Sequence, residues 1–97
     1  MHVIAKPVLV KVWKKYPDAK TALERWHQFM KSETFTSFAE LRELFGSADQ
    51  VGDLVVFNIG GTKYRLIAAV HYNRGKVYIR HILTHAEYDR GTWRNDK

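Results

Sequence analysis

The 97-residue sequence contains no cysteine, only two prolines and no acidic residue from Leu54 to Ala86. The absence of cysteine excludes disulfide bonds, thiolate zinc sites and a cysteine nucleophile, and it fits a cytoplasmic protein. No apolar run approaches the ~18 residues of a membrane span. Lysines are scattered through the apolar N-terminus, unlike a secretory signal peptide. We therefore expect a cytoplasmic protein with no membrane segment.

Enough apolar residues are present to build one buried core. Hydrophobic residues make up 45% of the chain and include three Trp, five Tyr and five Phe. Such a composition is too apolar for a disordered chain. Because 97 residues leave no room for a second core, we expect a single domain, residues 1–97.

Positive charge is concentrated in the second half of the chain. Residues 1–50 carry eight Lys or Arg against six Asp or Glu, whereas residues 51–97 carry eight against four. A basic segment without carboxylates attracts polyanions, although a basic surface that only keeps the protein soluble is the alternative. The interleaved aromatic residues favour the polyanion. The basic residues of the acid-free stretch are Lys63, Arg65, Arg74, Lys76 and Arg80.

The sequence predicts a helical half at about residues 5–46. Pro7 suits the first turn of a helix, which Pro17 ends. Asp18 is placed to cap a second helix, whose apolar residues recur at helical spacing. A third, short helix should follow Ser37, which with Glu40 has the S-x-x-E spacing of a capping box.

The period changes to two in a sheet half at about residues 54–90. We expect a three-stranded antiparallel meander with a short N-terminal edge strand, and a loop over Ser47–Asp53. The predicted strands are His2–Ile4, Leu54–Ile59, Thr62–Tyr72 and Val77–Leu83. Thr84 and Glu87 repeat the capping-box spacing, so a short C-terminal helix should begin near His85. Gly91–Lys97 is expected to be a frayed tail without a role. The predicted class is α+β.

An apolar face sets the expected register of the meander. A two-residue turn at Gly60-Gly61 places Phe57 opposite Tyr64, and an even second turn places Leu66 opposite Leu83. His81 then falls on the core side. The expected core face consists of Val55, Phe57, Tyr64, Leu66, Ala68, Val70, Val77, Ile79 and Leu83.

The opposite face gathers polar and charged side chains over an apolar floor. Thr84 is expected directly across from Arg65, and the terminal helix should present His85, Tyr88 and Asp89 on one side, at i, i+3 and i+4. The polar set is Asn58, Lys63, Arg65, His71, Tyr78 and Arg80, and the floor is Leu54, Val56, Ile67, Ala69 and Ile82. Such a charged, apolar-floored groove is typical of ligand and partner sites.

These residue types could cut RNA without a metal ion. Arg65 and Arg80 can clamp a phosphate, and Lys63 can hold the backbone or act as a base. His85 can be a general acid or a general base near neutral pH, and Tyr88 can stack on a nucleobase of the RNA or donate a proton. The expected RNA-binding residues are Lys63, Arg65, Arg74, Lys76, Tyr78 and Arg80. No carboxylate cluster accompanies the histidines, so no metal site or cofactor is expected.

Each residue could instead have only a structural role. Lys63 and Arg65 could be solvated strand positions, and Tyr88 could pack the helix on the sheet. Two further functions stay open at this point. One is a non-catalytic RNA- or DNA-binding module that uses the same basic face. The other is an adaptor domain with no nucleic-acid role.

Several segments together resemble the HigB family of type II toxins. The most specific is the closing Thr84-His85-Ala86-Glu87-Tyr88-Asp89, and the others are Met1–Ile4, Lys15–Pro17, Val56–Leu66, His71–Asn73 and Val77–Arg80. HigB proteins are similar to RelE toxins, which are small α/β folds that cleave mRNA, often on the ribosome.

The resemblance implies a RelE-like fold, mRNA as substrate and a hetero-oligomer with a HigA-like helix-turn-helix antitoxin. It also implies that Arg65, Arg80, His85 and Tyr88 are catalytic, with Lys63 in support. RelE-type toxins often use a lysine as the base, and several relatives use His or Glu. Because Asp89, at the edge, is the only carboxylate expected on this face, the base is His85 or Lys63, and we favour His85.

Overall fold

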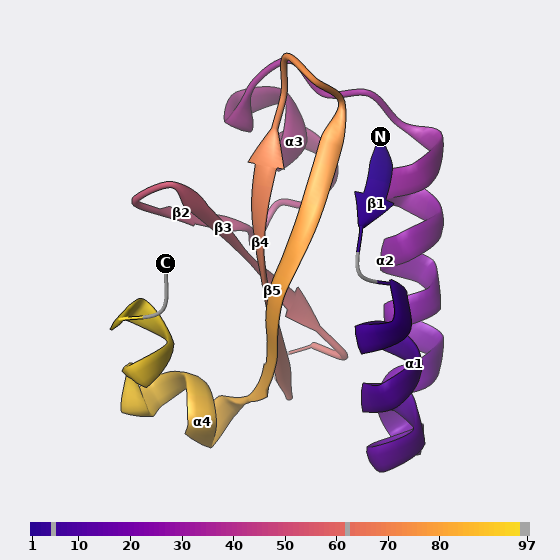
Figure 1. Ribbon diagram of the computed structural model, residues 1–97, viewed down its shortest axis with the longest axis vertical. Coiled ribbons are helices and arrows are strands. Elements are labelled where there is room, and N and C mark those ends of the chain that lie inside the picture. Colours follow the sequence, from indigo (N-terminus) through magenta and orange to yellow (C-terminus); the bar gives the residue numbers. More distant parts are fainter. Residues whose placement is uncertain (5, 62, 96–97) are drawn as a thin grey trace.

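The chain folds into an α+β structure around one mixed five-stranded sheet (Figure 1). This computed structural model describes residues 1–4, 6–61 and 63–95. The strands are β1 (His2–Ile4), β2 (Asp49–Val51), β3 (Leu54–Ile59), β4 (Tyr64–His71) and β5 (Lys76–Thr84). The α-helices are α1 (Lys6–Lys15), α2 (Lys20–Ser32), α3 (Phe38–Leu44) and α4 (His85–Arg90), and 3₁₀ helices span Pro17–Ala19 and Thr92–Asn95.

The sheet differs from the expected three-stranded meander with an edge strand, which is therefore wrong. Its order is β1-β5-β4-β3-β2. The segment Ser47–Asp53, expected as a loop, contains β2, which pairs antiparallel with β3. At the other edge β1 pairs parallel with β5. β2 is short and begins with the exposed polar residues Asp49 and Gln50, so it offers only one residue, Val51, of the β-branched or aromatic kind that indicates a strand.

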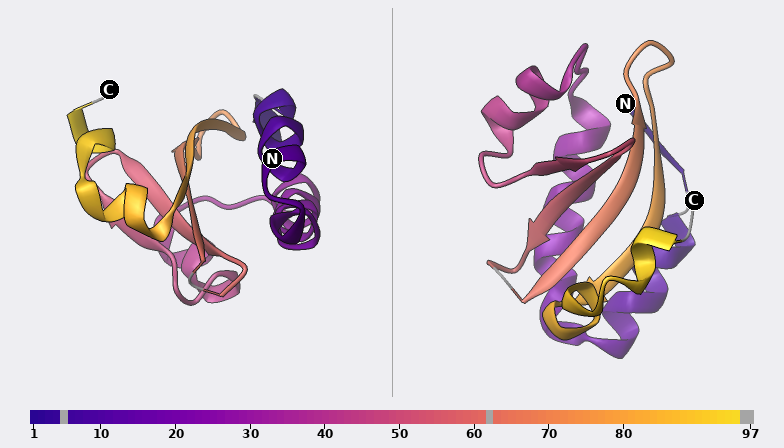
Figure 2. Two further views of the ribbon diagram at one scale, coloured as in Figure 1. Left: turned by 90° about the horizontal axis from the view of Figure 1, so that it is seen from below. Right: turned by 90° about the vertical axis from the view of Figure 1, so that its left-hand side faces the viewer.

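Helices α1 and α2 cover one face of the sheet, while the C-terminal segment lies on the other (Figure 2, left). The main core fills the space under the helices, and Phe57 is its largest fully buried side chain. The rings of Trp26 and Phe45 meet Phe57 edge-on, at centroid distances of 5.4 and 5.1 Å. This face is apolar throughout, as the alternation in β3 and β4 predicts.

The first hairpin has a longer turn than expected. Ile59 pairs with Tyr64, and Phe57 pairs with Leu66 instead of Tyr64. The register is displaced by two residues, and an even displacement leaves each side chain on its predicted face. Gly60 and Gly61 both have positive φ, 62° and 70°, which favours glycine at these positions. Thr62, expected to start the next strand, lies outside the described residues.

A bulge changes the register of the second hairpin. Near the turn Val70 pairs with Val77, but beyond the bulge Ile67 pairs with His81. Arg80 is the extra residue on β5 and has no partner on β4. An inserted residue moves every following side chain of its strand to the other face.

The bulge overturns several expected positions at the end of β5. Leu83, expected in the main core, lies opposite Arg65 on the other face, and His81 moves there too. Ile82, expected in the groove floor, packs against the main core instead. Thr84 is therefore not across from Arg65.

The C-terminal segment is a packed part of the fold, so the prediction of a frayed tail from Gly91 is wrong. Trp93 is only 3% exposed and forms a second cluster with Val56 and Ile67. Its indole N–H donates to the Tyr88 carbonyl at 3.0 Å. The last two residues of the expected tail, 96–97, lie outside the described residues. Across the described ranges, no helix combines the length and apolarity needed to cross a membrane.

Candidate active site

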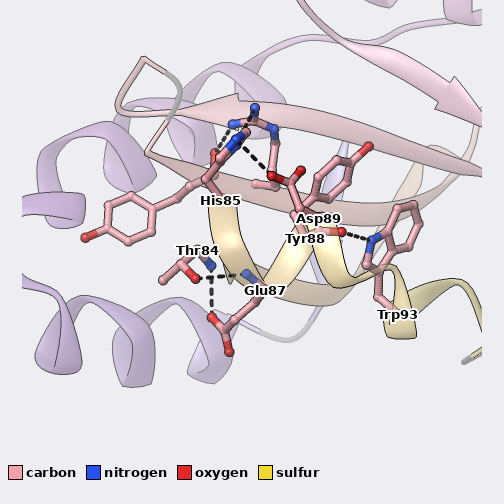
Figure 3. Close-up of polar contacts among 8 residues, drawn as sticks. Thr84, His85, Glu87, Tyr88, Asp89 and Trp93 are labelled. Atoms are coloured by element: carbon pink, nitrogen blue, oxygen red, sulfur yellow. Dashed lines mark hydrogen bonds and ion pairs between the residues drawn. The ribbon is translucent and has the colours of Figure 1, made fainter.

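The start of α4 is fixed by the predicted capping box (Figure 3). The Thr84 hydroxyl accepts from the Glu87 N–H at 3.3 Å, and the Glu87 carboxylate accepts from the Thr84 N–H at 3.0 Å. That backbone hydrogen bond holds the pKa of Glu87 below its ordinary value. The His85 N–H donates to the Lys63 carbonyl at 3.1 Å. The helix start is thus tied to the turn between β3 and β4, which places His85 beside Arg65.

His85 lies between a guanidinium and a carboxylate. Arg65 Nη2 is 3.2 Å from His85 Nδ1. At the other ring nitrogen, Asp89 Oδ2 is 3.1 Å from His85 Nε2 (Figure 3). The His85 and Asp89 side chains are 57% and 59% exposed, so a large ligand can reach them. The i, i+4 spacing on α4 predicts this contact, and the structure shows it.

Two aromatic rings extend the cluster along the C-terminal segment. The Arg65 guanidinium lies 5.4 Å from the centroid of the Tyr88 ring. Tyr88 stacks on Trp93 with centroids 5.1 Å apart and an interplanar angle of 18°. The Arg94 guanidinium lies 5.3 Å from the Trp93 ring. Two cations, Arg65 and Arg94, therefore flank a pair of stacked rings, and the contact with Tyr88 holds the Arg65 side chain close to α4.

Lys63 is held at the edge of this cluster by Asp18. Its ammonium lies 3.4 Å from Asp18 Oδ2, and the Tyr64 hydroxyl donates to Asp18 Oδ1 at 2.8 Å. The Tyr64 bond first, and then Lys63, hold the pKa of Asp18 below its ordinary value. Asp18 was expected to cap the second helix, but Ala19 occupies that position. This ion pair places the Lys63 ammonium beside the turn to which the start of α4 is bonded.

Arg80 does not join Arg65 in the α4 cluster. It lines a cavity of about 770 Å³ on the same side of the sheet, together with Trp93, Arg94 and residues of the β2–β3 turn such as Asp53. Because Tyr88 stacks on Trp93, this cavity borders the α4 cluster. Arg80 is also the residue of β5 that the bulge leaves unpaired.

The remaining predicted RNA-binding residues lie at the far end of the β4–β5 hairpin. Arg74 is in the exposed turn, and Lys76 and Tyr78 follow on β5 opposite His71 and Ala69. Six residues of extended strand separate Arg65 from His71, which is roughly 20 Å. The Tyr78 ring meets the His71 ring edge-on at 5.1 Å. The predicted site residues thus divide into the cluster near α4, Arg80 in the bordering cavity, and a basic hairpin tip.

Three residues near the site were not predicted from the sequence to belong to it. Trp93 and Arg94 belong to the segment expected to fray, and Asp18 was assigned to a helix cap. A tryptophan two residues after Gly91, in an otherwise polar terminus, is the signal that could have indicated packing. Nothing in the local sequence pairs Asp18 with Lys63, because the contact spans 45 residues.

No group of three or more acidic or histidine side chains within the described ranges is arranged to hold a metal ion. Arginine, lysine, histidine and tyrosine dominate the site, and these groups bind phosphate and move protons. The fold and the site together define a small α+β domain with a cationic cluster of the kind that can bind phosphate.

Comparison with known families gives the same class. A family model described as HigB_toxin, RelE-like toxic component of a toxin-antitoxin system, matches residues 19–91. The match covers more than half of the chain, so the protein belongs to the HigB toxin family. As the toxic component of such a system, it has an antitoxin as its partner. The family resemblance found in the sequence is confirmed.

Curated relatives agree over nearly the full length. The mRNA interferase toxin HigB of Escherichia coli strain K12 is 36% identical over 92 residues, which cover 92% of this chain and 88% of the relative. The mRNA interferase HigB of Shigella flexneri shows the same identity and coverage. The mRNA interferase HigB of Escherichia coli O6:H1 strain CFT073 is 30% identical over 95 residues, 95% of this chain and 92% of the relative.

Proposed function

We propose that the protein is an mRNA endoribonuclease toxin that cuts mRNA in the cytoplasm, on the ribosome, by metal-independent chemistry. The observation that carries the proposal is the cluster at the start of α4, where Arg65 contacts both His85 and Tyr88. A guanidinium that can bind a phosphate, an imidazole that can transfer a proton and a phenol therefore lie together. The names of the curated relatives support the same activity.

In the proposed reaction, His85 takes the proton from a ribose 2′-OH. The 2′-oxygen then bonds to the adjacent phosphorus, and the bond from phosphorus to the 5′-oxygen breaks. Arg65 stabilises the negative charge that develops on the phosphate, and the Tyr88 hydroxyl gives a proton to the leaving oxygen. The products are a 2′,3′-cyclic phosphate and a 5′-hydroxyl.

The other basic residues hold the RNA chain in this proposal. Lys63 binds the backbone at one side of the scissile phosphate, and Arg80 binds it from the cavity that borders the α4 cluster. Arg74, Lys76 and Tyr78 extend the basic surface along the hairpin, where they would contact the nucleic acid farther from the cut.

The antitoxin that we propose is a HigA-like helix-turn-helix protein, which forms a hetero-oligomer with the toxin. An antitoxin that occupies the α4 cluster or the bordering cavity would block the phosphate site. The apolar floor beside the charged residues, with Leu54 and Leu83 only partly buried, suits a protein partner as well as RNA.

Induced expression tests the proposed activity. Cells that express the wild type should stop growing, and primer extension on a reporter mRNA should show discrete new 5′ ends. Arg65→Ala and His85→Ala should abolish both effects although the proteins stay folded. Normal growth and intact mRNA with folded wild-type protein would overturn the proposal. A non-catalytic binding module would instead bind RNA and leave it uncut.

A further inference from the structure

Asp89 is a charged residue of the site for which the proposed reaction names no role. It lies on α4 one helical turn after His85, and its Oδ2 is 3.1 Å from His85 Nε2. This is the same imidazole that Arg65 approaches from the opposite nitrogen, Nδ1, at 3.2 Å. Both nitrogens of His85 therefore have a defined neighbour.

The two neighbours fix the position of the imidazole proton. A guanidinium carries only donors, so a hydrogen bond from Arg65 requires an unprotonated Nδ1. A neutral imidazole has one proton, which must then be on Nε2, where it donates to the Asp89 carboxylate. The geometry thus selects one tautomer of His85.

We infer that Asp89 is the positioning residue of His85, and that it keeps Nδ1 as the nitrogen that accepts the 2′-OH proton. In the free protein Arg65 covers Nδ1. A phosphate that binds Arg65 draws the guanidinium away and exposes Nδ1 beside the ribose. The inference rests on the proposed function, because it assigns the geometry behind the proton transfer.

The proton balance of the step is complete. Nδ1 gains the 2′-OH proton, so His85 becomes an imidazolium whose Nε2–H still donates to Asp89. The carboxylate keeps its charge and stabilises the cation. The leaving 5′-oxygen takes a proton from Tyr88. Water then removes a proton from Nδ1 and returns one to the Tyr88 oxygen, which restores both residues.

Kinetics of mRNA cleavage on translating ribosomes test the role. Asp89→Ala should lower kcat by roughly 10²-fold, less than His85→Ala, and change KM by much less. Asp89→Asn, whose amide oxygen can still accept from Nε2, should recover part of the loss. Glu43→Ala, which removes an exposed acid on α3, is the matched control and should cleave like the wild type.

The tautomer supplies a readout that a merely structural role would not move. In protein labelled with ¹⁵N-histidine, the His85 signals, assigned by their absence in His85→Ala, should show a proton-bearing Nε2 and a bare Nδ1. Asp89→Ala should shift the proton toward Nδ1. A wild-type His85 that carries its proton on Nδ1, or an unchanged tautomer and kcat in Asp89→Ala, would overturn the inference.

These outcomes are separable from a failure of the proposed function. If the wild type does not cut RNA, the ribonuclease proposal fails. If the wild type cuts and His85→Ala does not, but Asp89→Ala cuts at the wild-type rate, only the role of Asp89 fails. Should Asp89→Ala not fold, Asp89→Asn and the wild-type spectrum carry the test alone.

Discussion

The two faces of the sheet are built for different purposes. The face under α1 and α2 is a continuous core in which Phe57 and Leu66 are almost completely buried. The face under α4 has a small apolar cluster around Trp93, bordered by a cavity and by exposed charges. The first face supplies most of the buried apolar area, and the second uses a thin apolar layer to hold polar groups in place. Stability and activity should therefore respond to different substitutions.

The largest difference between the effect on activity and the effect on stability is expected for His85→Ala. Loss of the proposed base should lower the cleavage rate by about 10²- to 10⁴-fold, while urea unfolding should stay close to wild type because the side chain is exposed. His2→Ala, an exposed histidine on β1, is the matched control. If His2→Ala lost as much cleavage as His85→Ala, the loss could not be assigned to the face that carries α4.

Phe57→Ala should act on the other face. Removing a fully buried ring that Trp26 and Phe45 surround should lower the free energy of unfolding by about 3–5 kcal/mol. The protein that stays folded at low temperature should still cleave, since the α4 cluster is on the opposite face. Urea denaturation followed by far-UV circular dichroism measures the first effect, and a loss under about 1 kcal/mol would contradict the packing.

Trp93→Phe tests how the C-terminal segment supports the site. The phenyl ring keeps most of the apolar contact but loses the N–H that donates to the Tyr88 carbonyl. We expect a stability loss of about 1 kcal/mol and a several-fold loss of cleavage, because Tyr88 is less firmly held. Cleavage that is unaffected despite the stability loss would show that the Tyr88–Trp93 stack does not serve the site.

The smallest effect is expected for the pH dependence of stability that comes from the capping carboxylate of Glu87. The pKa of Glu87 is below its ordinary value because of the Thr84 N–H, so folding favours the carboxylate. Its contribution is complete above the unfolded pKa and is lost as pH falls through the lower folded pKa. The stability difference between wild type and Glu87→Gln should shrink between about pH 6 and about pH 3. A stability difference that grows as the pH falls would contradict a pKa of Glu87 that folding lowers.

Local spacing was enough to predict the helix that carries the site. The capping box and the i, i+4 relation put His85, Tyr88 and Asp89 on one side of α4, and both are visible in six consecutive residues. Alternation likewise placed the residues of β3 and β4 on their correct faces, since a register displacement of two does not exchange the faces.

The bulge could not be predicted in the same way. Arg80 occurs within an apparently regular β5, and whether it pairs or bulges is decided by packing between β4, α4 and Trp93. The bulge leaves Arg80 without a partner on β4, and it moves Leu83 out of the main core. The ion pair of Lys63 with Asp18 was equally hidden, because the two residues are far apart in the chain.

The ends of the cut RNA test the central claim most directly. Fragments from a reporter mRNA in cells that express the wild type can be ligated to an adaptor with and without prior phosphorylation of their 5′ ends. Attack by the ribose 2′-OH predicts 5′-hydroxyl ends, which ligate only after phosphorylation and are absent with His85→Ala. Ends that ligate directly as 5′-phosphates would contradict proton transfer from the 2′-OH to His85.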